Sequence, residues 1–532
     1  MKKSILKFII ALALIHSAIP LPAQQGYSDY KTLMSRIDAL ARTNPGLCTV
    51  SPISKTVGGK EIRVITVGTG EKDSKPGIAV FGGVEGNYLL GREIAVALAE
   101  SLVKGNGELL QKVTFYIFPD VSPDATEQYF LPLRYERTVN ANPADDDRDF
   151  ATDEDPFEDL DKDGMITHIR VTDPSGSYTT DPDDERLMIE SDLSKGLTGG
   201  FLFFTEGIDN DDDGKFNEDG SGGANFNRNF SYDYEEFGLN AGLHPMSEPE
   251  VKAVADFLFD RFNIYTVIAF GPQDNLGQPF KNAPPSPDRR ITSIMKSDEI
   301  INKLVSDRYH EITGLKGAPV LDKVPGNFMD WAYYHYGRYS FSTPGWWYPV
   351  EKGKNPESEF LKYAEKNKLT DVLVPWKPFE HPGFPGKKVE TGGIRPFVMM
   401  NPPADSISAI ANKHIVFITN VAEMHPALEF TGLETENAGS DVFRINVKVH
   451  NKGVFATLPE VGEMNSWTRI MRLSVETQKG QEIISGLKVQ RISRLEGGQS
   501  AEFSWLIKGK GPVKITAGAV NTGIITSTAD LR

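Results

Sequence analysis

The sequence predicts an α/β fold with a mixed, mainly parallel sheet and helices on both faces, followed by an all-β sandwich. Between Tyr27 and Gly271, short apolar runs alternate with segments of helical spacing, an order typical of parallel sheets that are covered by helices. Beyond His425, apolar and polar residues alternate in short runs separated by turn residues, which is typical of a sandwich. A chain of 532 residues is long enough for both units.

The elements of the α/β part are predicted in chain order from apolar spacing. Leu33, Ile37 and Leu40 recur at helical spacing and predict the first helix. Strands are expected at 50–53, 62–67, 77–81, 113–118 and 264–271. Helices are expected at 94–102 and from the segment 245–251 to Phe262. Ligands bind at the carboxyl ends of such strands, so the loop after Phe81 is the predicted site. Sandwich strands are expected at 441–449, 470–475, 501–507 and 513–517.

Residues 1–23 are predicted to be a secretory signal peptide. A basic start is followed by the apolar run from Phe8 to Leu14 and by the small-residue cleavage site Leu21-Pro-Ala23. We therefore expect an exported protein, periplasmic or extracellular, with no transmembrane segment in its mature part. Cys48 is the only cysteine, which excludes an internal disulfide.

An acidic insertion is predicted at about 145–220. It holds 25 acidic and 6 basic residues, so the formal net charge of -16 comes from this segment rather than from the whole chain. The negative net charge argues against a nucleic-acid partner. Two loops in the insertion have the pattern Asp-x-Asp-x-Asp-Gly, which places alternate carboxylates around one calcium ion. The calcium ligands predicted in the two loops are Asp159, Asp161, Asp163, Asp209, Asp211 and Asp213.

The calcium loops depart from the EF-hand pattern at the twelfth position. A bidentate glutamate is expected there, and the two loops have Arg170 and Gly220 instead. We therefore expect sites that are weaker or that take ligands from elsewhere in the chain. A solvated acidic loop without an ion is the alternative.

Three motifs in the α/β part resemble those of the zinc carboxypeptidases of the carboxypeptidase A family. Gly82-Gly-Val-Glu-Gly-Asn-Tyr88 stands where the family reads Gly-Gly-Ile-His-Gly-Asn-Glu. Gly222-Gly-Ala-Asn-Phe-Asn-Arg-Asn-Phe230 resembles Gly-Val-Asp-Leu-Asn-Arg-Asn-Phe, and Asp330-Trp-Ala-Tyr333 resembles Asp-Trp-Ser-Tyr. The resemblance runs roughly from Tyr27 to Met424 and implies a carboxypeptidase-like α/β domain at 24–424, with the β-sandwich domain at 425–532.

The same resemblance implies that the catalytic residues are lost. The family's zinc ligands fall on Glu85, Tyr88 and Phe270, and its catalytic glutamate falls on Pro344. Hydrolysis by a zinc enzyme of this fold needs three zinc ligands and a general base. A phenylalanine cannot be a zinc ligand, and a proline has no side-chain base. We therefore expect no zinc. The family's substrate-binding residues fall on Arg137, Asn227, Arg228 and Tyr333.

Three functional hypotheses follow. The first is a pseudopeptidase that binds the C-terminal carboxylate of a peptide, or of a peptidoglycan-type peptide, without hydrolysis. The second is an active metallocarboxypeptidase, or another hydrolase that uses Glu85 and Asp274. The third is a surface binding or scaffold protein that calcium stabilises and in which the sandwich is the functional part.

Overall fold

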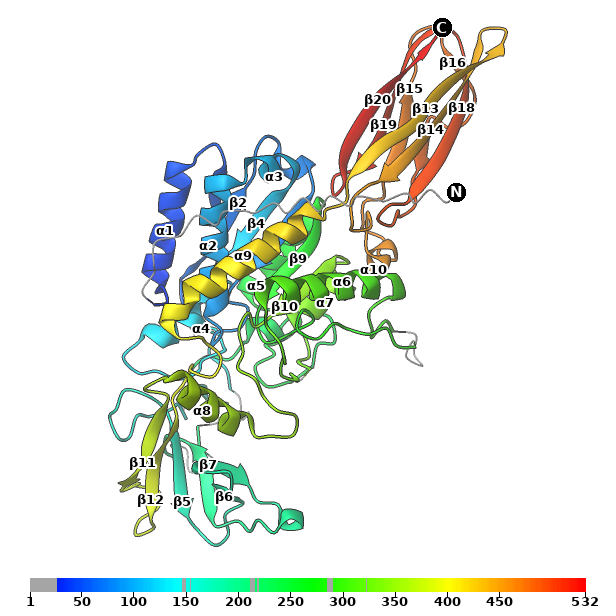
Figure 1. The fold of residues 1–532 in the computed structure, drawn as a ribbon. Coiled ribbons are helices and arrows are strands. Elements are labelled where there is room, and N and C mark those ends of the chain that lie inside the picture. Colours follow the sequence, from blue (N-terminus) through cyan, green and yellow to red (C-terminus); the bar gives the residue numbers. More distant parts are fainter. Residues whose placement is uncertain are drawn as a thin grey trace, which may run out of the picture.

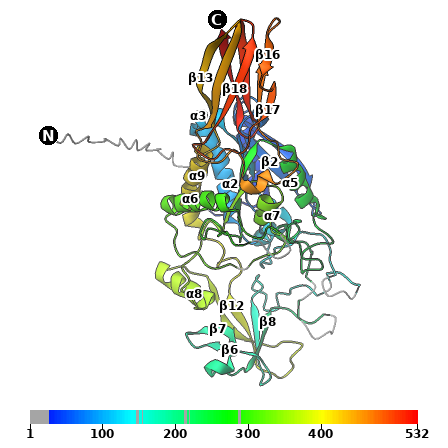
Figure 2. The same ribbon diagram turned by 90° about the vertical axis from the view of Figure 1, so that its right-hand side faces the viewer.

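The computed structural model describes residues 26–145, 150–153, 155–210, 216–217, 220–284, 290–321 and 323–532. Figure 1 shows an α/β body in the centre, a small β lobe below it and a β-sandwich above it, and Figure 2 shows the same order from the side. The predicted signal peptide and the predicted ligands Asp211 and Asp213 lie outside the described residues. Within the described ranges, no helix combines the length and the apolar character needed to cross a membrane.

The central sheet has six strands in the order β1-β2-β4-β3-β9-β10. The first two pairings, β1 with β2 and β2 with β4, are antiparallel, and the other three are parallel. The predicted mixed, mainly parallel sheet is therefore confirmed. In chain order the strands are β1 (Cys48–Lys55), β2 (Glu61–Val67), β3 (Gly77–Phe81), β4 (Thr114–Phe118), β9 (Ile264–Phe270) and β10 (Tyr339–Thr343).

Helices cover both faces of this sheet, as predicted. One buried cluster joins the sheet to α1 (Tyr30–Thr43), α2 (Leu90–Gly105), α3 (Gly107–Lys112), α6 (Lys296–Thr313) and α9 (Ile407–Glu423). A second cluster on the opposite face joins it to α5 (Pro249–Asp260) and α7 (Phe328–Tyr334). Short helix α4 (Pro123–Thr126) follows β4 at the carboxyl edge.

The β lobe was not predicted. It is a six-stranded antiparallel sheet in the order β11-β12-β5-β8-β6-β7. Four strands come from the acidic insertion, and two arrive from about 200 residues later in the chain. The strands are β5 (His168–Thr172), β6 (Tyr178–Asp181), β7 (Asp184–Glu190), β8 (Phe201–Thr205), β11 (Leu373–Phe379) and β12 (Val389–Ile394), and α8 (Pro356–Asn367) lies beside them in Figure 1.

The C-terminal part is an all-β sandwich, as predicted. Its two four-stranded antiparallel sheets have the orders β13-β14-β18-β16 and β17-β15-β19-β20, and one buried apolar cluster lies between them. Short helix α10 (Glu460–Glu463) joins the sandwich to α6 and α7. The strands are β13 (Leu428–Gly439), β14 (Val442–Asn451), β15 (Arg472–Glu476), β16 (Glu482–Ser485), β17 (Val489–Arg491), β18 (Ser500–Lys508), β19 (Gly511–Ala519) and β20 (Gly523–Leu531).

Candidate binding site

The loop after β3 places Glu85 in a buried network of amide side chains. Glu85 is 8% exposed, and its carboxylate accepts hydrogen bonds from Asn225 Nδ2 and from Asn227 Nδ2, the latter at 3.1 Å. Burial raises the pKa of the Glu85 carboxyl, although the two amides and the charge of Arg228 act in the opposite direction. The carboxylate is therefore satisfied by protein donors in the place where the family has a zinc ligand.

Phe270 belongs to the apolar core rather than to an open site. It is 1% exposed, and its ring meets the His414 ring edge to face at a centroid distance of 5.4 Å. Burial lowers the pKa of His414 to about 4, so its imidazole is neutral at pH 7, and Nε2 donates to the Gly345 carbonyl at 2.7 Å. Pro344 is also buried.

Tyr88 is partly buried, and burial raises the pKa of its hydroxyl. The four positions therefore offer one satisfied carboxylate, one phenol held in its neutral form, one core aromatic ring and one proline. Zinc needs three nitrogen, sulfur or carboxylate ligands and an open position for water. The residues present do not fit a zinc ion.

Two residues of the Glu85 network were missed from the sequence. Asn225 precedes the 3-10 turn η4 (Phe226–Arg228), and its Oδ1 accepts from the backbone of Asn227 at 2.7 Å. Gln273, which follows β9, accepts from Asn227 Nδ2 through Oε1 at 2.7 Å. The Asn225 signal was visible in the second motif, where the family has aspartate. Gln273 left no such signal, because only the packing of two distant loops brings it to Asn227.

Three of the four predicted binding residues are engaged within the protein. Both N–H groups of the Asn227 amide donate to Glu85 and Gln273. Arg137 donates from Nε to the Val139 carbonyl at 3.0 Å and from Nη2 to the Asn140 carbonyl at 2.6 Å.

Tyr333 is the third engaged residue. Its hydroxyl donates to Asp298 Oδ2 at 2.7 Å and accepts from Met295 N at 2.9 Å. Asp298 also accepts from the backbone N–H groups of Glu460 and Val461, at the start of the sandwich helix α10. The tyrosine is thus fixed at the junction between the α/β body and the C-terminal part.

Arg228 is the fourth predicted binding residue, and it differs from the other three. Its side chain is partly buried, and its charge lowers the pKa of Glu85. Among the described residues, its guanidinium has no hydrogen bond and no ion pair. Arg228 therefore keeps a set of N–H donors beside the amide network.

Asp274, the other residue named in the hydrolase hypothesis, follows β9. Burial raises its carboxyl pKa to about 6. Its Oδ1 accepts from Gly277 N at 2.6 Å, and Oδ2 has no hydrogen bond among the described groups.

The first acidic loop gathers oxygen ligands, including one that the sequence did not predict. Carboxylate oxygens of Asp159, Asp161 and Glu206 lie within 4.8 Å of one another. Glu206 directly follows β8, is fully buried and accepts from Leu160 N at 2.9 Å. Asp163 is exposed and outside this group. Its Oδ1 accepts from the backbone N–H of Met165. In the second loop, Asp209 is described and its partners Asp211 and Asp213 are not.

The fold and this site define a class of protein: a carboxypeptidase-like α/β domain with a carboxylate at the first zinc-ligand position and an arginine beside it. A family model described as "Zinc carboxypeptidase" matches residues 33–170 and 204–369, which is more than half of the chain. The chain therefore belongs to the zinc carboxypeptidase family. Residues 427–530 match a model described as a domain of unknown function, DUF8731.

One named relative is a carboxypeptidase. Carboxypeptidase B of Astacus astacus is 26% identical over 118 residues, which are 22% of this chain and 39% of that enzyme. The chain thus aligns with about two fifths of the length of that curated relative.

Two solved structures are also similar. Bovine thrombin-activatable fibrinolysis inhibitor, in complex with tick carboxypeptidase inhibitor, is 17% identical with a TM-score of 0.41, covering 75% of this chain and 97% of that one. Carboxypeptidase A of Helicoverpa armigera is 13% identical with a TM-score of 0.38, covering 74% and 73%.

Proposed function

We propose that this protein binds the C-terminal carboxylate of a peptide, or of a peptidoglycan-type peptide, and does not hydrolyse it. The observation that carries the proposal is the contrast between Arg228 and the residues around it. The Arg228 guanidinium has no hydrogen-bond acceptor among the described residues. By contrast, Glu85 is hydrogen-bonded to the buried amides and Phe270 packs in the apolar core.

The chemistry of the two halves of the site supports binding without cleavage. A guanidinium can donate two parallel hydrogen bonds to a carboxylate, which fixes the plane of the ligand. Hydrolysis by this fold would need a zinc-bound water and a base to take its proton. Phe270 and Pro344 provide neither, so bound peptide keeps its C-terminal residue.

The test is a calorimetric titration of the purified protein with an N-acetylated tripeptide and with the same tripeptide as its C-terminal amide. We expect the free carboxylate to bind, and the amide and the Arg228→Gln variant to bind about tenfold or more weakly. Arg308→Gln is the matched control, because Arg308 pairs with Glu311 on the exposed face of α6. Equal binding of both peptides, or of both variants, contradicts the proposal.

The same preparation separates binding from the hydrolase hypothesis. The tripeptide is incubated with the protein, with and without added zinc, and the release of its C-terminal residue is followed by mass spectrometry. We expect no release in either case. Release that disappears in Glu85→Gln or Asp274→Asn would favour the alternative in which these two carboxylates catalyse hydrolysis.

Calcium binding at the first acidic loop stays a prediction, and the convergence of Asp159, Asp161 and Glu206 favours it. Calcium prefers carboxylate oxygens, and a ligand that binds only the folded state raises its thermal stability. We expect the melting temperature to fall on chelation with EGTA and to recover with calcium. Glu206→Gln should remove this response, whereas Glu380→Gln, an exposed control in the same lobe, should not. A melting temperature that EGTA leaves unchanged contradicts calcium binding.

Export is proposed from the predicted signal peptide alone. The expected observation is a mature chain that begins near Gln24 and is found outside the cytoplasm. Mass spectrometry of the protein from its native source tests this, and an uncleaved chain would contradict it.

A further inference from the structure

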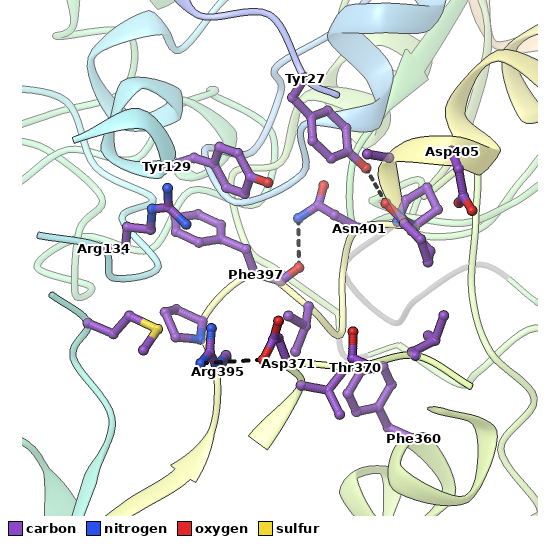
Figure 3. A pocket seen from close by; sticks show the side chains of 18 of the residues that line it. Tyr27, Tyr129, Arg134, Phe360, Thr370, Asp371, Arg395, Phe397, Asn401 and Asp405 are labelled. Carbon is purple, nitrogen blue, oxygen red and sulfur yellow. Dashed lines mark hydrogen bonds and ion pairs between the residues drawn. The ribbon is translucent and has the colours of Figure 1, made fainter. Parts of the chain in front are cut away.

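A cavity lies between the α/β body and the β lobe, and neither Glu85 nor Arg228 lines it. It has a volume of about 550 Å³, which is within the usual range of small-molecule pockets. Six separate parts of the chain line it: Tyr27, Tyr129 with Arg134, Met165, Phe360, the segment 368–372, and residues 395–398 with 401–405. Figure 3 shows these side chains around the open space.

Aromatic rings form one wall of this cavity. The Tyr129 ring meets the Phe397 ring edge to face at 5.2 Å and the Tyr27 ring at 5.6 Å. The Arg134 guanidinium lies over the Tyr129 ring, 5.6 Å from its centroid. In Figure 3, Tyr129, Arg134 and Phe397 lie on the same side of the cavity. This wall can receive a flat apolar group.

Two arginines bring hydrogen-bond donors to the cavity that the protein does not use. Among the described residues, the Arg395 guanidinium pairs with Asp371, but the 3.9 Å between Nη2 and Oδ1 is too long for a hydrogen bond. The Arg134 guanidinium has no hydrogen-bond acceptor among the described residues. With Lys368, three cationic side chains line the cavity against two acidic ones, Asp371 and Asp405.

Asn87 and Leu89, in the loop between β3 and α2, hold the cavity wall in place. Asn401 donates to the Asn87 carbonyl and accepts from Leu89 N, both at 2.7 Å. Glu136 accepts from Phe397 N at 2.7 Å and from Asn87 Nδ2 at 3.0 Å.

Phe397, in the wall of this cavity, also has a strained backbone, with φ +71°. Bulky side chains rarely adopt this left-handed region, and such strain tends to occur at ligand-binding sites. The Phe397 N–H donates to Glu136 and its carbonyl accepts from Asn401 Nδ2 at 3.0 Å, so the backbone that orients this ring is fixed on both sides.

We propose that this cavity binds a small organic carboxylate with an aromatic body, the ring against Tyr129 and Phe397 and the carboxylate toward Arg134 and Arg395. A planar anion matches the fork of a guanidinium better than a point charge does. Such a ligand is a free aromatic acid or the aromatic C-terminal residue of a peptide, and the two share the chemistry that the cavity recognises.

The probe is N-acetyl-L-phenylalanine, and the titration uses the Arg228→Gln variant so that the carboxylate site of the proposed function is absent. In that background we expect saturable binding. Its amide, N-acetyl-L-phenylalaninamide, should bind about tenfold or more weakly because it lacks the charge, and acetate should bind weakly because it lacks the ring. Comparison with a dipeptide that ends in phenylalanine distinguishes a free acid from a peptide end.

Arg395→Gln and Arg134→Gln, each added to that background, should weaken binding of the probe by about tenfold or more, and Arg308→Gln should leave it unchanged. Arg134 is exposed, so its variant tests the proposal even if the Arg395 variant is unstable. Absence of saturable binding, equal binding of the amide, or binding that Arg134→Gln leaves unchanged overturns the proposal. None of these results bears on the tripeptide binding at Arg228.

Discussion

Replacement of Glu85 should destabilise the protein in proportion to the number of acceptor oxygens removed. The two carboxylate oxygens accept from Asn225 and Asn227, and both asparagines are at most 3% exposed. Glu85→Ala leaves both donors without this acceptor. A buried donor without a partner costs about 1–3 kcal/mol.

The buried charge partly offsets this cost. Burial raises the pKa of Glu85, so removing the ionised carboxylate recovers part of its desolvation energy. We therefore expect Glu85→Ala to lower the free energy of unfolding by about 2–4 kcal/mol at pH 7. Glu85→Gln keeps one acceptor oxygen and turns an NH2 group toward the other donor, so about 1–2 kcal/mol is expected.

The assay is urea unfolding followed by tryptophan fluorescence, with Glu108→Ala on the exposed surface of α3 as the control. The control should change stability by less than about 0.5 kcal/mol. If Glu85→Ala is as stable as the control, the carboxylate is not a structural acceptor. If the loss in Glu85→Ala disappears when wild type and variant are compared after chelation of metals, Glu85 is a metal ligand and the interpretation of the site is wrong.

Three further predictions concern residues around the site. Phe270→Ala should cost about 3–5 kcal/mol in urea unfolding because it empties a core position, whereas Leu243→Ala, 89% exposed, should be neutral. A tolerated Phe270→Ala contradicts the core assignment. Burial raises the pKa of Glu250 from 4.5 to about 7, so the unfolded state releases this proton at lower pH than the folded state. Stability should therefore fall by about 3 kcal/mol as the pH rises from about 4.5 to about 7. The difference in unfolding free energy between wild type and Glu250→Gln should follow this curve, and a difference that does not change with pH refutes it. Tyr333→Phe should lower the free energy of unfolding by about 1–3 kcal/mol, because the hydrogen bond to Asp298 is lost, and should leave tripeptide binding unchanged in calorimetry. Weaker binding would show that the tyrosine contacts the ligand.

The α/β body and the sandwich could be predicted because their signals are local. The apolar run of β3 and the spacing of Leu33, Ile37 and Leu40 are read from neighbouring residues. The β lobe has no comparable signal. Strand β5 pairs with β12, about 220 residues away, in the register Val171 to Val389, and a pairing over that separation cannot be read from local periodicity.

The candidate site could be predicted only in part, for a related reason. The motifs gave the positions of Glu85, Asn227 and Arg228, but not their hydrogen-bond partners. Gln273 and Glu206 enter their clusters from other loops and carry no motif. The aromatic cavity is lined by six separate parts of the chain, so no single stretch of sequence indicates it.

The residues at positions 85 and 225 both differ from the family motifs, and the two differences are matched to each other. The family motifs have histidine and aspartate at these positions, and this chain has glutamate and asparagine. A histidine at 85 would donate to a carboxylate at 225, whereas Glu85 accepts from the Asn225 amide. The pair thus keeps one hydrogen bond with its direction reversed. With histidine alone restored at 85, a zinc-bound imidazole would carry its proton on the other nitrogen and turn that N–H toward the Asn225 Nδ2 donor.

Phe270 is matched to its neighbours in the same way. A side chain at position 91 would place its Cβ 2.4 Å from the Phe270 Cβ, and one at position 345 would lie 3.3 Å from its ring. Both neighbours are glycines, and Gly345 also accepts from His414. A histidine at 270 would bring a polar ring into this buried, mostly apolar space, at the cost of burying a polar group. Restoring a zinc site would therefore require concerted changes in the Glu85 loop, the η4 turn and the core around Phe270, and no single substitution should recover zinc binding.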